Sequence, residues 1–259
     1  FMTDQELISL FEHIRYQIVV FSKDATSPLP QSVGSGFMLD YKGETFFVTA
    51  DHVVNTHDNG VRKIKDNMIA ISTNIPAIIE GRLQTKMIPI GGIYFFDQIR
   101  VDIDKATVDN MPLFDAAFCI LQDWQINTKC ITCEVKIEGA SVPVGDRKIH
   151  LKATDIIIAN NEDVYSVVLN SQQTFKTGLK LVGEDDSQNY YILQYTDEII
   201  YKDWAGLSGS AILNQDGKLI GIACAIDTSG KRLIYVKKIQ RIMPLMDVAI
   251  LEKNQINNK

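Results

Sequence analysis

Basic residues are in short supply in this sequence, which carries 26 lysines and arginines against 32 aspartates and glutamates. The formal net charge is −6, and the pattern contains no clustered basic face of the kind that contacts nucleic acid. The short basic run at residues 62–65 is more typical of a solvated turn. The composition therefore predicts a protein without a nucleic-acid partner.

Long apolar runs are also missing, because no stretch reaches the roughly 20 residues that a membrane-spanning helix needs. The N-terminus lacks the charged and then apolar pattern of a secretory signal. We interpret Met2 as the native start and Phe1 as an added residue. A cytoplasmic protein without a membrane partner is expected, unless a signal segment lies further upstream.

Cysteine is scarce, with only Cys119, Cys130, Cys133 and Cys224 in the chain. In a reducing compartment we expect these to be free thiols. Cys130 and Cys133 have the spacing of metal ligands, but there is no second pair and the four histidines are scattered. A strand over residues 130–137 is the simpler interpretation, so we expect no metal site.

Repeats, low-complexity segments and long linkers are absent, and strands do not alternate with long helices. Instead, about thirteen short β-rich segments separated by turn signals run between residues 36 and 236. This pattern predicts an all-β sandwich or barrel, in one large domain or in two small ones that share an interface. The only candidate joint between two halves is the polar stretch at residues 122–129.

A helix is expected at each end of the chain. Thr3 and Glu6 form a capping box, and apolar residues then recur at helical spacing for about three turns. We expect this first helix to pack on the body of the domain. A second apolar stripe predicts a helix over residues 237–253, which either starts or kinks at Pro244.

Residues 205–210 (AGLSGS) form a loop of small residues before a predicted hairpin that turns at Asp216 and Gly217. Glycine permits positive φ angles and leaves room for a substrate. Such a loop can direct successive backbone N–H groups at one point, as an oxyanion hole requires. Taken alone, however, an ordinary glycine- and serine-rich loop is the simpler explanation.

Two stretches upstream supply a base and a carboxylate. His52 follows the apolar strand at residues 46–49, and Asp115 opens the strongly apolar strand at residues 116–121. Each has an ordinary structural explanation, as a histidine at a strand end and as an aspartate that caps a strand. Nucleophilic serine chemistry nevertheless needs these residue types, since a base must take the hydroxyl proton and a carboxylate must orient that base.

The chain order His52, Asp115, Ser208 is that of chymotrypsin-like proteases, and it differs from the order in subtilisins and α/β-hydrolases. Residues 49–52 (TADH) look like that family's Thr-Ala-Ala-His motif, and residues 115–117 (DAA) look like its Asp-x-Ala motif.

Two further motifs extend the likeness. Residues 206–210 (GLSGS) look like the Gly-x-Ser-Gly-Gly/Ser motif, and residues 34–37 (GSGF) look like the Gly-Ser-Gly-Phe hairpin before the histidine strand. From about residue 17 to residue 243, the chain resembles the trypsin/chymotrypsin-like serine peptidases, in particular members of bacterial or viral type.

The resemblance implies an all-β fold of two antiparallel β-barrels with the site in the cleft between them, to which the two helices are added. The first barrel would span residues 17–122 and carry His52 and Asp115. The second would span residues 130–236 and carry Ser208. The whole chain would then form one peptidase domain.

The same resemblance implies a serine endopeptidase that acts on protein or peptide substrates without a metal or a cofactor. Ser208 would attack a peptide carbonyl and form an acyl-enzyme, while His52 takes the hydroxyl proton and passes it to the leaving amine. Asp115 would fix the imidazole tautomer, and the N–H groups of Gly206 and Ser208 would form the oxyanion hole.

The sequence departs from the family pattern in three places. Leu207 stands where trypsin-like zymogens carry an aspartate, so activation by N-terminal cleavage is not expected. Asp51 replaces the small residue before the histidine. Because neighbouring side chains in extended backbone point apart, Asp115 remains our choice for the orienting carboxylate. The cysteine pairs of secreted members are missing, which fits a cytoplasmic protein.

Substrate preference stays open at the level of sequence. The family pattern puts the pocket floor at Lys202 and the wall at Ala223, Cys224, Ala225 and Ile226. Lys202 would disfavour a basic substrate side chain, whereas Asp203 would favour one, so a shift of one residue reverses the prediction. Both charges are equally well explained as solvated loop residues.

Two functions therefore remain open. The complete set of catalytic residue types predicts an active serine endopeptidase. The unusual Leu207 and Asp51 and the added N-terminal helix are also compatible with a catalytically silent or partner-activated trypsin-like module, which binds or regulates and needs an activating protein. A collapsed loop at residues 206–208 would favour this alternative.

Overall fold

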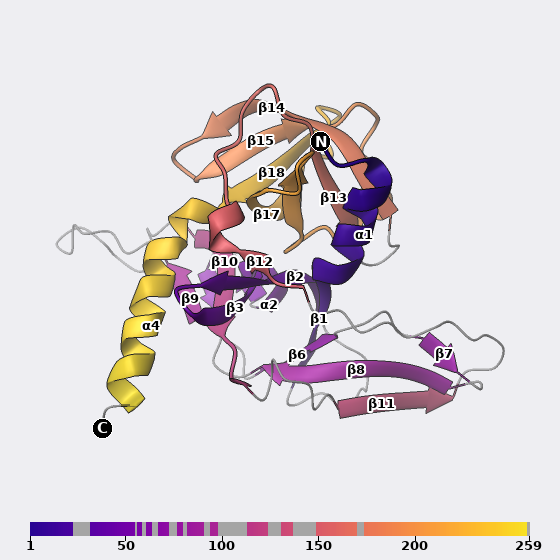
Figure 1. Cartoon of the computed structure of the whole chain (residues 1–259). Coiled ribbons are helices and arrows are strands. Elements are labelled where there is room, and N and C mark those ends of the chain that lie inside the picture. Colours follow the sequence, from indigo (N-terminus) through magenta and orange to yellow (C-terminus); the bar gives the residue numbers. More distant parts are fainter. Residues whose placement is uncertain are drawn as a thin grey trace.

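The computed structural model of the chain consists mainly of antiparallel strands, with one helix near each end (Figure 1). The structure describes residues 1–22, 32–54, 56–58, 61–63, 67–72, 77–79, 82–90, 94–97, 113–123, 131–136, 149–169 and 174–257. In this part of the chain the strands form a large open sheet, a closed barrel and a small hairpin. No helix of the described residues has the length and apolar character needed to cross a membrane.

The open sheet has ten strands, which are β1 (Arg15–Ser22), β2 (Ser32–Tyr41), β3 (Glu44–Thr49), β6 (Asn67–Ser72), β7 (Ala77–Ile79), β8 (Arg82–Ile90), β9 (Tyr94–Asp97), β10 (Leu113–Ile120), β11 (Ile131–Lys136) and β12 (Leu151–Lys152). Its main path is β11-β8-β6-β1-β2-β3-β10-β9, with β7 beside β8 and β12 beside β2. The separate hairpin pairs β4 (Thr56–Asp58) with β5 (Val61–Lys63).

The hairpin between β2 and β3 illustrates how the local sequence sets the fold of this sheet. Lys42 and Gly43 form a two-residue turn, and both have positive φ angles, of 49° and 83°. This is the conformation that a two-residue hairpin turn with the right-handed strand twist requires. The turn fixes the register of β3, whose last residue, Thr49, leads directly into the segment that carries His52.

The closed barrel is formed by β13 (Tyr165–Leu169), β14 (Thr174–Asp185), β15 (Tyr190–Gln194), β16 (Ala211–Asn214), β17 (Leu219–Ile226) and β18 (Leu233–Lys238). They close in the order β13-β14-β15-β18-β17-β16. One apolar cluster, which includes Val167, Leu193, Ile220 and Val236, gathers residues from these strands. Alternation along each strand sends every second side chain away from this cluster.

A second apolar cluster joins the barrel to the open sheet. It contains Phe37 and Phe118 from the sheet together with Leu213 and Ile222 from the barrel, all buried. Because these side chains come from both halves, this part of the core is continuous across the interface between them. The two halves are thus packed against each other along the face where the candidate site lies.

Helix α1 (Asp4–Ile14) confirms the predicted capping box and links the two halves. The N–H of Glu6 donates to Thr3 Oγ1 at 3.3 Å, and the N–H of Thr3 donates to Glu6 Oε2 at 2.7 Å. The helix runs directly into β1, while the ring of its Phe11 lies 6.2 Å from that of Phe175 in β14. Figure 1 shows α1 beside β13 of the barrel.

The C-terminal helix begins later than predicted. Residues 237 and 238 end strand β18, a short 3-10 turn follows at Ile239–Arg241, and α4 runs from Met243 to Asn257. Pro244 lies in the first turn of α4, where a backbone N–H would have no partner within the helix. Of the two possibilities predicted for Pro244, the structure therefore shows a helix that starts there and not one that kinks there.

The boundary between the halves also differs from the predicted one. Residues 130–236 were assigned to the second barrel, but β11 pairs with β8 and β12 pairs with β2, both in the open sheet. The closed barrel starts only at β13. Alternation along a strand indicates which side is buried but not which partner the strand joins. Cys130 and the side chain of Cys133 lie outside the described residues.

Candidate active site

Strand pairing in the open sheet brings His52 and Asp115 together. The short helix α2 (Asp51–Val54) follows β3 after one residue, so His52 stands just beyond the end of that strand. Strand β10 pairs with β3, with Ala117 opposite Thr49. Asp115 lies two residues earlier on β10 and therefore reaches the level of His52.

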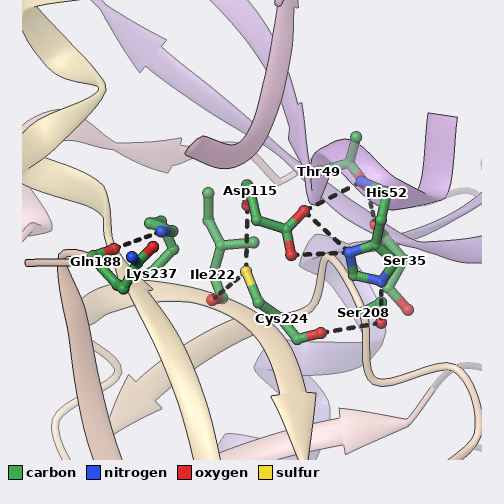
Figure 2. A network of polar contacts seen from close by, with 9 residues as sticks. All are labelled: Ser35, Thr49, His52, Asp115, Gln188, Ser208, Ile222, Cys224 and Lys237. Carbon is green, nitrogen blue, oxygen red and sulfur yellow. Dashed lines mark hydrogen bonds and ion pairs between the residues drawn. The ribbon is translucent and has the colours of Figure 1, made fainter. Parts of the chain in front are cut away.

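The structure places His52 within hydrogen-bond distance of both Asp115 and Ser208 (Figure 2). His52 Nδ1 lies 2.9 and 2.8 Å from the two carboxylate oxygens of Asp115, whose Oδ1 also accepts the backbone N–H of His52 at 3.1 Å. His52 Nε2 lies 2.8 Å from Ser208 Oγ. The Asp115 side chain is 17% exposed and the His52 side chain 38%, so the carboxylate is covered while the imidazole faces solvent.

The environment favours an ionised Asp115 and a proton on His52 Nδ1. Burial raises the pKa of Asp115, but the hydrogen bonds and charge of His52 outweigh it, so this pKa lies below its ordinary value. Burial likewise lowers the pKa of His52, but Asp115 and then Asp51 outweigh it and raise this pKa above 6.5. An ionised carboxylate only accepts hydrogen bonds, so Nδ1 donates and leaves Nε2 of the neutral imidazole to accept from Ser208.

The loop before Ser208 contains a type II turn. Ala205 has φ −59° and ψ 138°, Gly206 has φ 83°, and the N–H of Leu207 donates to the carbonyl of Trp204 at 3.3 Å. A type II turn needs positive φ at its third residue, which Gly206 supplies without strain. The Gly206 carbonyl accepts the hydroxyl of Ser35 at 2.6 Å, so strand β2 of the other half helps to fix this peptide.

Gly209 lies where the Ser208 loop meets strand β2 most closely. Its φ is 88°, and a Cβ added there would approach the carbonyl oxygen of Ser35 to 1.9 Å and Thr49 Oγ1 to 2.5 Å. The N–H of Ser35 also donates to the carbonyl of Ser208 at 2.8 Å. Any residue with a side chain would therefore push the loop away from the sheet that carries His52.

A β-bulge at Cys224 lies against both Asp115 and Ser208. The pairing of β17 with β18 shifts register between Ala223 and Ala225, which leaves Cys224 as the extra residue. The Cys224 thiol donates to the backbone carbonyl of Asp115 at 3.2 Å, and Ser208 Oγ lies 3.4 Å from the Cys224 carbonyl oxygen. The bulge thus contacts the two residues that flank His52 in the network of Figure 2.

A groove of about 370 Å³ opens beside Ser208. Apart from His52, the described residues that line it carry no side chain that is charged at neutral pH. They are Tyr201, Trp204, Ala205, Gly206, Leu207, Ser208, Cys224, Ala225, Ile226 and Thr228. Trp204 is buried beneath it, in edge contact with Tyr195 at 5.1 Å between ring centroids.

The predicted floor of the specificity pocket needs correction. Lys202 and Asp203 are exposed and do not line the groove, whereas Tyr201 and Trp204 of the same 3-10 turn (Tyr201–Trp204) do. Counting residues back from the serine does not reveal which side of a short turn faces the cleft. Ala223 belongs to the buried cluster of the closed barrel, so the wall is formed by residues 224–226.

Leu207 is held in the closed barrel. It is 4% exposed and belongs to the apolar cluster of that barrel, together with Trp204. The residue before the serine is therefore anchored by apolar burial.

No family model matches the sequence, and no curated protein sequence matches it. A solved structure does: a serine endoprotease from Yersinia pestis aligns with 98% of this chain and 69% of its own, at a TM-score of 0.51 and 15% sequence identity. The chain shares its fold with a serine endoprotease. The predicted fold class is thereby confirmed, with one closed six-strand barrel, one curled half-barrel sheet, and N- and C-terminal helices. At this identity the likeness concerns the fold alone.

Sequence reasoning missed three residues that surround the site. Ser35 was noted only as part of a hairpin motif, yet its hydroxyl and its N–H both bind the Ser208 loop. Cys224 lines the groove, and its thiol also donates to the backbone carbonyl of Asp115, which the sequence does not predict. Lys237 was assigned to a C-terminal helix, but it lies buried in β18 near this network. No sequence signal distinguishes this lysine from its exposed counterparts.

Proposed function

We propose that this protein is a serine endopeptidase with Ser208 as nucleophile, His52 as general base and Asp115 as orienting carboxylate. The contact of 2.8 Å between Ser208 Oγ and His52 Nε2, in line with the Asp115 contact at Nδ1, carries this proposal. The solved neighbour with the same fold is a serine endoprotease, which supports it at the level of fold. The nucleophile, the base and the orienting carboxylate all come from this one chain.

In the proposed reaction, Ser208 Oγ attacks the carbonyl carbon of a peptide bond as its proton moves to His52 Nε2. The N–H groups of Gly206 and Ser208 then stabilise the negative oxygen of the tetrahedral intermediate. His52 gives the proton to the amine as the C–N bond breaks, which leaves an ester on Ser208. Water releases the acid by the same proton transfers in reverse. The type II turn, with Gly206 at a φ of 83°, gives this part of the loop a defined backbone conformation, which supports the proposed role.

The groove selects an uncharged, apolar side chain next to the bond that is cut. A charged side chain in this groove would lose hydration and find no partner of opposite charge among the described lining residues, which is costly. Ile226 is branched and stands in the wall, so it limits the size of the side chain that enters. The substrates are thus proteins or peptides cut after residues such as alanine, valine or leucine, in preference to lysine or glutamate.

The silent-module alternative predicts a collapsed loop, in which hydroxyl and imidazole are out of contact. The contacts described above support the enzyme instead, without the need for an activating partner to bring the three groups together. We place this activity in the cytoplasm, since Cys119 and Cys224 are free thiols within the described residues.

Labelling with a fluorophosphonate probe tests the assignment of the nucleophile. The intact protein is expected to be labelled, and Ser208→Ala is expected to lose the label completely. Ser187→Ala, in an exposed turn of the barrel, is the matched control and should be labelled like the parent. A label that persists in Ser208→Ala refutes the assignment. A parent protein that neither reacts with the probe nor cleaves any peptide supports the silent module.

Cleavage of a diverse peptide library tests the substrate class. We expect cuts after apolar residues, with at least about 10²-fold discrimination against lysine and arginine. Ile226→Asp places a carboxylate in the groove wall and should shift the preference toward basic residues. A parent enzyme that prefers lysine or arginine would contradict the proposed substrate class while leaving the nucleophile assignment intact.

A further inference from the structure

Lys237 is a fully buried cation on the face of the closed barrel that meets the open sheet. Its exposed fraction is 0%, and it pairs across β17 and β18 with Ile222. Directly paired residues in antiparallel strands share one face of the sheet. Ile222 belongs to the apolar cluster between the two halves, so Lys237 lies on this same face, and its neighbour Val236 points into the barrel.

Two contacts of the ammonium group favour a cation at this place. Lys237 Nζ donates to the carbonyl of Gln188 at 2.6 Å and lies 3.7 Å from the ring centroid of Tyr190. A carbonyl dipole and an aromatic face both attract a cation, but neither carries a full negative charge. In Figure 2, Ile222 and Cys224 lie between Lys237 and Asp115.

We propose that Lys237 is a positioning residue of the candidate active site, in which it acts as the buried counter-charge of Asp115. It does not touch the substrate and acts through the carboxylate. The bulge residue Cys224 lies between the two, because its thiol donates to the backbone carbonyl of Asp115 while its neighbours pair with the strand of Lys237. The role in catalysis rests on the proposed function, whereas the electrostatic role can be measured without it.

The balance of charges explains what such a cation does. In the resting site, Asp115 is negative, His52 neutral and Lys237 positive, so the lysine offsets the charge of Asp115. In the transition state, His52 becomes positive and the substrate oxygen negative, and these two charges cancel. Without the lysine, the site carries one more uncompensated negative charge in both states, and such a charge is costly to bury.

Several titratable groups of the described residues face this region. Burial lowers the pKa of Lys237, and Cys224, Asp115 and Asp185 act in the opposite sense. Lys237 in turn helps to hold the pKa of Asp115 down, after the larger contributions of His52. Burial raises the pKa values of Cys224 and Tyr190, so both stay neutral near pH 7. His52 and Asp51 complete the set on the side of the open sheet.

An NMR titration of the His52 imidazole tests the proposal. Lys237→Met keeps most of the side-chain volume and removes the charge, so the His52 pKa is expected to rise, by about half a unit. Lys237→Arg retains the charge and is expected to restore the parent value. Lys238→Met is the matched control, because the adjacent Lys238 pairs instead with Glu184 and with Asp186 at 2.8 Å, away from the site.

A His52 pKa that is the same in the parent and in Lys237→Met overturns the proposal, whether or not the protein cleaves peptides. In active protein, the acid limb of kcat/KM should shift upward with the imidazole pKa. If Lys237→Met does not fold, the double variant Lys237→Met/Asp115→Asn decides the question. Recovery of folding when both charges are removed supports charge pairing, and a double variant that also fails to fold contradicts it.

Discussion

Two histidine–aspartate pairs can be compared in the described part of the molecule. His52 Nδ1 lies 2.8 Å from Asp115, and His150 Nδ1 lies 3.0 Å from Asp40. As hydrogen bonds the two pairs are nearly the same. They differ in the second ring nitrogen and in burial, because only His52 faces a serine hydroxyl.

Burial runs in opposite directions in the two pairs. In the first, the carboxylate is 17% exposed and the imidazole 38%, whereas in the second the carboxylate is 44% exposed and the imidazole 19%. A covered carboxylate with an accessible imidazole can orient a base that works on a substrate. A covered imidazole with an accessible carboxylate supports packing. The comparison teaches that the surroundings, rather than the contact, distinguish a candidate catalytic pair from a structural one.

The strongest test of this comparison replaces each aspartate in turn. Asp115→Asn presents an amide to Nδ1 and favours the wrong imidazole tautomer, so kcat should fall by about 10⁴-fold. Asp40→Asn is expected to leave kcat unchanged, since His150 has no role in the proposed reaction. Peptide hydrolysis by the two purified variants measures the difference. Equal losses of kcat in both would contradict the view that only the Asp115–His52 pair is catalytic.

The next largest effect concerns the glycines near each pair. Gly209→Ala meets the carbonyl of Ser35 and has unfavourable φ, so it should lower the free energy of unfolding by about 2–5 kcal/mol and activity by about 10²-fold. Gly43→Ala, in the turn near Asp40, has a similar φ of 83° but open space around it. This variant should lower the free energy of unfolding by only about 1–2 kcal/mol and leave the activity unchanged. Denaturant unfolding and peptide hydrolysis of both variants check this, and similar costs would contradict the role of the close approach.

A smaller effect is expected for the hydroxyls that support each pair. Ser35→Ala removes the bond to the Gly206 carbonyl, which is worth about 1 kcal/mol, and should lower kcat/KM about fivefold. Thr45→Ala removes a bond of 2.7 Å to Asp40 and should cost similar stability without a loss of kcat/KM. Steady-state kinetics separates the two, and an unaffected Ser35→Ala would mean that the turn needs no support from strand β2.

The smallest effect is a displacement of the pH profile. His52 must be neutral to accept the serine proton, and Asp115 raises its pKa above the ordinary value of 6.5. Activity should therefore fall as the pH drops through a pKa that lies above 6.5, rather than at or below it. The profile of kcat/KM against pH measures this value. His150→Gln should leave the acid limb in place. A shifted acid limb in that variant would show that His150 contributes to the titration, which would contradict its assignment to His52.

The sequence allowed a good part of the fold and the three central residues of the site to be predicted. The apolar alternation of segments such as Tyr165–Leu169 and the order of His52, Asp115 and Ser208 were sufficient for this. The first is a local pattern and the second is an order along the chain, so both can be seen without knowledge of contacts between distant segments. The structure brings the three residues into contact as the proposed mechanism requires.

What the sequence did not predict depends on contacts between distant segments. The return of β11 to the open sheet is set by pairing with β8, and the burial of Lys237 is set by the meeting of two sheets. The exposed positions of Lys202 and Asp203 depend on how one short turn faces the cleft. Neither composition nor periodicity carries this information, because it belongs to the packing of elements rather than to the elements themselves.

The path of the first 22 residues has a consequence for how the molecule opens. The N–H of Met2 donates to the carbonyl of Gln215 in the barrel at 2.9 Å, and α1 then continues without a loop into β1 of the sheet. The first 22 residues therefore connect the closed barrel to the open sheet. The two halves can separate only if this segment detaches from the barrel, so fraying of the amino terminus and widening of the cleft between the halves are one cooperative event. The amide protons of α1 and of the Ser208 loop should thus exchange with solvent at similar rates.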